Sequence, residues 1–115
     1  MNTLSRVHEI LAPAPDRPRR AQIVRVVVTD VEGPDRSRLV LAPGDRLIVA
    51  NRSRRTLHVA PQDFFGNSFG HYVLEPGEST PALVVQGLWF QVEMHVAGRK
   101  FYPLDVYLAA NTTVV

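Results

Sequence analysis

The sequence predicts an all-β fold: a Greek-key antiparallel β-sandwich of seven to eight strands with an extended N-terminal arm. Two observations lead to this prediction. Short β-rich runs recur about every ten residues and are separated by proline and glycine, which is typical of a sandwich or barrel. The chain has 115 residues, 45% of them apolar and 21% charged, a size and composition that suit one globular domain with a single core.

The first 21 residues are expected to form the arm. Residues 12–20 (APAPDRPRR) contain three prolines and three arginines, and no helix or strand ladder continues through such a segment. The residues before it predict a short helix, because their apolar side chains have roughly helical spacing. Such a helix is too short to be stable alone, so the arm needs its own domain or a neighbouring subunit to pack on. The predicted interface residues of the arm are Leu4, Val7, Ile10 and Leu11.

The sandwich domain is expected over residues 22–109, followed by a C-terminal tail of high β-propensity at 110–115. Pro43–Gly44 and Pro76–Gly77 each suit a type II turn, since proline fixes φ and glycine accepts a positive φ. The predicted strands are 22–30, 37–42, 45–51, 56–60, 71–75, 80–86, 88–96 and 103–109.

The run at 88–96 alternates most clearly. Strand alternation places Phe90, Val92 and Met94, together with Leu88, on one apolar face. That face is expected to be the core, and Trp89 is expected on the outer face, covered by the arm or by a partner.

Composition and motifs exclude several classes of function. The chain has no cysteine, which removes disulfides, thiolate nucleophiles and cysteine-bound metal centres. It contains no G-x-S-x-G, no H-E-x-x-H and no phosphate-binding glycine loop, so we predict no enzyme activity and no catalytic residues. A net charge of +2 argues against a nucleic-acid partner. No run is long enough to span a membrane and the N-terminus lacks the pattern of a secretion signal, so a cytoplasmic or virus-particle location is expected.

Several motifs occur in a recognisable order between Val40 and Leu108. Pro43–Gly44–Asp45 leads into LIVAN, Leu57–His58–Val59 precedes two phenylalanines, and LEPGES at 74–79 precedes GLWFQVEMH at 87–95. This order resembles the cupredoxin family, whose fold the resemblance therefore implies. It also implies that His58 and His95 fall on the two histidine ligands of the family and that Val92 falls on the copper-ligating cysteine. Because valine has no ligand atom, a blue-copper centre is excluded and no cofactor is predicted.

The two histidines still leave two interpretations open. If the cupredoxin topology holds, His58 and His95 lie within a few ångström of each other, and with Glu93 or Asp63 they could hold copper(II) or zinc. Alternatively, both are ordinary strand histidines that bond to the backbone or to water.

Two further segments are candidates for contacts with a partner. The loop at 63–70 carries Phe64, Phe65 and Phe69 among glycines. These rings either cap the open end of the sandwich or form a contact with another subunit. The turn with Arg52, Arg54 and Arg55 is either a solvated hairpin tip or, beside the arginine–proline arm, a binding site for carboxylates or phosphate.

Together these features predict a non-enzymatic structural or interaction subunit of a larger protein assembly. The expected partners are other protein subunits, including copies of the chain in a homo-oligomer, as in a decoration or tail protein of a virus particle. The alternative is a cupredoxin-like module that binds a metal or a small molecule through His58 and His95.

Overall fold

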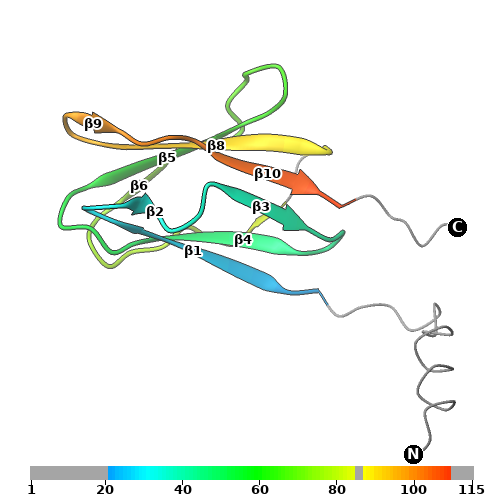
Figure 1. Cartoon of the computed structure of the whole chain (residues 1–115), viewed down its shortest axis with the longest axis horizontal. Helices are drawn as coiled ribbons and strands as arrows, with labels where there is room; N and C mark the ends of the chain where they lie inside the picture. The colour runs from blue at the N-terminus through cyan, green and yellow to red at the C-terminus, as the bar shows by residue number, and fades with distance from the viewer. Residues whose placement is uncertain (1–20, 85–86, 110–115) are drawn as a thin grey trace, which may run out of the picture.

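The computed structural model describes residues 21–84 and 87–109, which form two β-sheets packed face to face (Figure 1). The predicted all-β fold is confirmed. The described strands are β1 (Ile23–Thr29), β2 (Gly33–Pro34), β3 (Arg38–Leu41), β4 (Arg46–Asn51), β5 (Leu57–Gln62), β6 (Tyr72–Leu74), β7 (Leu83–Val84), β8 (Trp89–Val96), β9 (Arg99–Lys100) and β10 (Leu104–Leu108).

The two sheets differ in size. One has the strand order β2-β1-β4-β7, and the other has the order β3-β10-β8-β5-β6, with β9 paired to the end of β8. The expectation of a purely antiparallel sandwich is wrong in two places, because β1 pairs with β4 and β3 pairs with β10 in parallel. The first of these pairs is parallel because β3, in the opposite sheet, lies between β1 and β4 in the chain, and such a crossover returns the chain in its original direction.

The proline–glycine turns form where they were predicted. Gly44 and Gly77 both have a φ of 91°, the conformation that glycine adopts without steric cost. Strand limits agree with the predicted runs to within a few residues, except that the run at 80–86 gives only the short strand β7. Residues 85–86 of that run lie outside the described residues.

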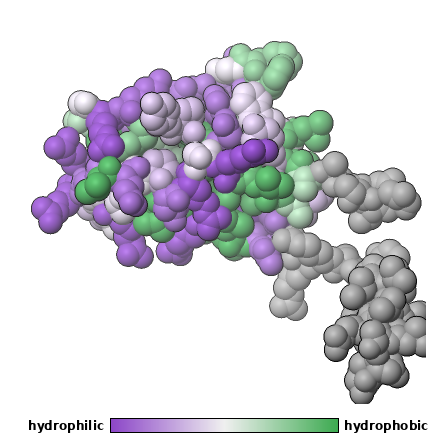
Figure 2. All heavy atoms as spheres, in the orientation of Figure 1, coloured by the Kyte–Doolittle hydropathy of each residue, from purple (hydrophilic) through white to green (hydrophobic). Residues whose placement is uncertain are grey.

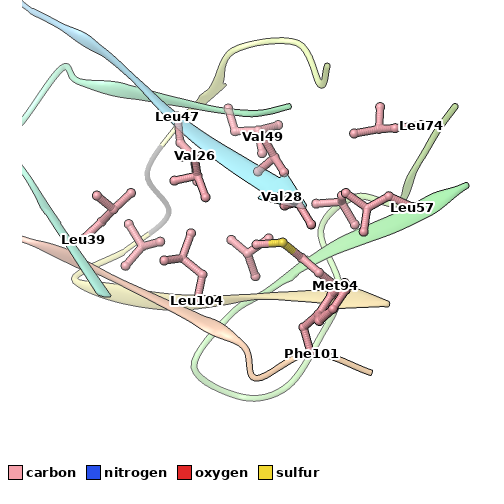
Figure 3. Packing of buried hydrophobic residues seen from close by; sticks show 14 of the residues in the cluster. Val26, Val28, Leu39, Leu47, Val49, Leu57, Leu74, Met94, Phe101 and Leu104 are labelled. Carbon is pink, nitrogen blue, oxygen red and sulfur yellow. The ribbon is translucent and has the colours of Figure 1, made fainter. Parts of the chain in front are cut away.

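The core lies between the two sheets (Figure 3). Val26, Val28, Leu47 and Val49 point inward from the first sheet, and every second residue of β5, β8 and β10 points toward them from the second. Phe90, Val92 and Met94 are fully buried, which confirms the predicted core face of β8. Leu88 is not part of that face, because regular pairing starts at Trp89 and Leu88, which precedes the strand, is 74% exposed.

Strand β1 begins and β10 ends at the same end of the sandwich (Figure 1). Residues 1–20 and 110–115 lie outside the described residues, and with them lie the predicted interface residues Leu4, Val7, Ile10 and Leu11. Within residues 21–84 and 87–109 there is no helix whose length and apolarity would allow it to cross a membrane.

Candidate functional site: an aromatic patch and a histidine cluster

The outer face of the larger sheet carries two groups of side chains, one aromatic and one of histidines. Because side chains alternate along a strand, the burial of Phe90, Val92 and Met94 turns Trp89 and His95 outward at opposite ends of β8. Trp89 lies opposite Tyr107 of β10, and His95 lies opposite His58 of β5.

The loop between β5 and β6 is held in shape by one carboxylate. Oδ1 of Asp63 accepts hydrogen bonds from the backbone N–H groups of Phe65 and Asn67, both at 2.9 Å. The backbone of Asp63 adds two more bonds, donating to the Asn67 carbonyl and accepting from the Gly66 N–H, both also at 2.9 Å. This network fixes the loop in a conformation that leaves Phe64 70% and Phe65 82% exposed.

The third phenylalanine of the loop behaves differently from the other two. The N–H of Phe69 donates to the Pro61 carbonyl at 3.0 Å, which brings this residue back to β5. Its half-buried ring then packs edge-on against Phe90, with ring centroids 5.3 Å apart. Phe69 therefore caps the core, while Phe64 and Phe65 remain on the surface.

We call Phe64, Phe65, Leu88, Trp89 and Tyr107 the aromatic patch. These residues line an open groove of about 800 Å³, and the loop stands out as a hydrophobic projection in Figure 2. The ring of Phe64 meets Trp89 edge-on at 5.6 Å, and Trp89 lies 6.4 Å from Tyr107. The Trp89 indole N–H is buried and has no hydrogen-bond partner within the described part of the chain.

The arginine turn lies at the other end of the sandwich. The backbone N–H of Arg54 donates to the Asp30 carboxylate just after β1, and Nη1 of Arg55 donates to the Ala97 carbonyl just after β8. Residues 1–20 of the arm lie outside the described residues, so the expectation that the arginine turn lies beside the arm stays a prediction. All three arginines are exposed, and the side chain of Arg55 links two loops of its own domain.

A cluster of three histidines occupies the outer face near the end of β8. The rings of His58 and His95 are stacked, with centroids 4.6 Å apart and planes only 4° from parallel. Nδ1 of His58 lies 3.3 Å from Nε2 of His71. His71 was not among the predicted site residues. Antiparallel pairing of the runs at 56–60 and 71–75 would nevertheless have predicted it to be a diagonal neighbour of His58 across the two strands.

These positions differ from what the family resemblance implies for a metal centre. Val92 is buried and faces the core, whereas His58 and His95 face outward from the same sheet. Strand β8 stays regular from Trp89 to Val96, so residues 92 and 95 point to opposite faces. Within residues 21–84 and 87–109, no group of three or more histidine and carboxylate side chains is arranged to hold a metal ion.

Comparison with known proteins yields structural likeness only. No protein-family model and no curated protein matches the sequence. A novel purple cupredoxin from Nitrosopumilus maritimus is similar with a TM-score of 0.56 at 11% identity, over 75% of this chain and 99% of that one. A Cu(I) amicyanin with a methionine-to-alanine substitution gives a TM-score of 0.60 at 11% identity, over 76% of this chain and 82% of the amicyanin. A second amicyanin mutant, with a proline-to-glycine substitution and in the reduced Cu(I) form at pH 4, gives 0.55 at 13% identity, over 80% and 85%. These likenesses show that the fold is cupredoxin-like, and the chain has no cysteine that could serve as a thiolate ligand.

Proposed function

We propose that this cupredoxin-like sandwich is a non-enzymatic interaction subunit that binds other protein subunits, copies of itself included, through the aromatic patch. The observation that carries the proposal is the pair of phenylalanine rings, 70% and 82% exposed on a loop held by hydrogen bonds. In the free subunit, apolar rings held exposed on such a loop have an unfavourable free energy of hydration. Burial against a partner removes that cost.

The energetics favour a protein partner. Burying one phenylalanine side chain stabilises a complex by about 1.5–3 kcal/mol before the costs of association are subtracted. Those costs are lower here, because Asp63 already orders the loop and little conformational entropy remains to be lost. Aromatic side chains in a groove of this kind are the residues that dominate binding energy in protein interfaces.

Polar groups around the patch supply directional contacts. The Arg38 guanidinium lies over the Tyr107 ring, 4.9 Å from its centroid, and Nε2 of Gln91 donates to the Asp105 carboxylate at 2.9 Å. An apolar centre with a polar rim is the usual composition of a protein interface.

Sedimentation equilibrium of the full-length chain tests the proposal. The double substitution Phe64→Ser with Phe65→Ser is expected to weaken self-association by more than about tenfold, since each lost burial exceeds the 1.4 kcal/mol that corresponds to one decade. Tyr102→Ser is the matched control, because Tyr102 is 89% exposed and lies outside the patch. A full-length chain that stays monomeric at high micromolar concentration, or a double variant that associates like the parent, would overturn the proposal.

A further inference from the structure

The histidine cluster is separate from the aromatic patch and presents two imidazole nitrogens at one point on the surface. His58 comes from β5 and is half-buried, and His71 is exposed just before β6. The pairing of β5 with β6, with Leu57 opposite Leu74 and His58 opposite Val73, fixes the backbone from which both side chains extend. The 3.3 Å contact thus joins the two strands of one hairpin.

We infer that Nδ1 of His58 and Nε2 of His71 form a binding site for a divalent transition metal, with water completing the coordination. Two nitrogens that each lie about 2.0–2.1 Å from a tetrahedral zinc ion are about 3.3–3.4 Å apart. The observed separation of 3.3 Å is the edge of such a tetrahedron. Without a metal, the same 3.3 Å contact is a hydrogen bond between the two rings. A bound ion would replace the shared proton, and each ring would turn so that its lone pair points at the ion.

The third histidine has a different role. A metal ion binds imidazole nitrogen in the plane of the ring, and the rings of His58 and His95 lie in nearly parallel planes, 4° apart. Their lone pairs therefore do not converge on one ion. His95 is a positioning residue, because its stacked ring limits the rotation of His58 about its side-chain bonds.

The surroundings are compatible with a bound cation. Lys100 lies opposite His95 on β9, and its ammonium group forms an ion pair with Glu93 at 3.8 Å, which reduces its repulsion of a metal. Imidazole without thiolate suits copper(II) and zinc, and copper(II) binds more tightly by the usual order of divalent ions. Two protein ligands leave coordination positions for exchangeable water, so the site differs from the closed structural zinc sites.

Titration of the full-length, tag-free chain with Zn(II) alone, followed by calorimetry, tests the inference. One equivalent is expected to bind. His58→Ala and His71→Ala should each weaken binding by more than about tenfold, since even loss of a residue that only supports a ligand costs about 10- to 100-fold. His8→Ala is the control, because His8 is the fourth histidine of the chain and lies outside the described residues. This variant should bind within about threefold of the parent.

A second readout identifies the ligands directly. Electron paramagnetic resonance with one equivalent of Cu(II) should show hyperfine coupling to two imidazole nitrogens in the parent and to one in His71→Ala. If His71→Ala binds as tightly as the parent, or if His8→Ala loses as much affinity as His71→Ala, the assignment is overturned. Binding of less than one equivalent at high micromolar Zn(II) overturns it as well. Association through the aromatic patch is measured separately, so neither result decides the other.

Discussion

Replacing Asp63 with alanine tests whether the aromatic patch works because it is preorganised. The substitution removes the acceptor of two hydrogen bonds, from the N–H groups of Phe65 and Asn67. It leaves both exposed rings in place and keeps the two backbone hydrogen bonds of residue 63. The variant therefore changes the order of the loop without changing its apolar surface.

The magnitude follows from the entropy of the loop. Fixing one backbone residue costs about 1–2 kcal/mol, and the side chain of Asp63 ties down two residues. We expect the free energy of association to be about 2 kcal/mol less favourable in the Asp63→Ala variant, which weakens binding about 30-fold. The stability of the sandwich should fall by less than about 1.5 kcal/mol, because both freed N–H groups belong to exposed residues and can bond to water.

The assay compares sedimentation equilibrium with thermal unfolding for the same samples. Asp63→Asn is the matched control, since the amide oxygen still accepts and should retain most of the association. If Asp63→Ala associates within threefold of the parent, preorganisation of this loop does not contribute to binding and the reasoning fails. A fall in stability as large as that of a core truncation would show instead that the loop supports the fold.

Three further predictions concern the buried residues of the sandwich. Val92→Cys should give no intense blue band with Cu(II), because the new thiol would face the core while His58 and His95 face outward; such a band in the absorption spectrum would refute the described faces of β8. Phe90→Ala should cost about 3–5 kcal/mol in denaturant unfolding as a core truncation, and a loss below 1 kcal/mol would contradict its buried position. Asn51→Ala should cost about 3–5 kcal/mol by urea titration, since its fully buried amide makes four hydrogen bonds; a near-neutral result would mean that the partners find other bonds.

Local chemistry made much of the fold predictable. Proline and glycine at 43–44 and 76–77 fixed two turns, and strict alternation along 88–96 identified Phe90, Val92 and Met94 as core residues. The parallel pairs were missed because a strand's own pattern does not say which distant strand lies beside it. The two-residue strands β2 and β9 were missed because they are too short to show any alternation.

The candidate sites were less predictable, because side chains of the same type in one segment differ in burial and in their contacts. Phe64 and Phe69 belong to one loop, yet one ring is exposed and the other packs on the core. What separates them is a backbone hydrogen bond from Phe69 to Pro61, a tertiary contact with no signature in residue type. Arg55 is likewise used to link two loops, which its sequence neighbours Arg52 and Arg54 do not reveal.

The two proposed sites share a hairpin but should act independently. His58 and His71 lie at the base of the hairpin, and the loop with the exposed rings is closed above them by its own contacts, the Phe69–Pro61 hydrogen bond and the bridge between Gln62 and Ser68. A metal at the base therefore adds little order to a loop that is already tied. On β8, Trp89 and His95 are separated by six residues, about 20 Å along the strand, so a partner seated on the patch need not touch the histidines. A subunit of this design could bind a metal and a protein partner at the same time, with little coupling free energy between the two events.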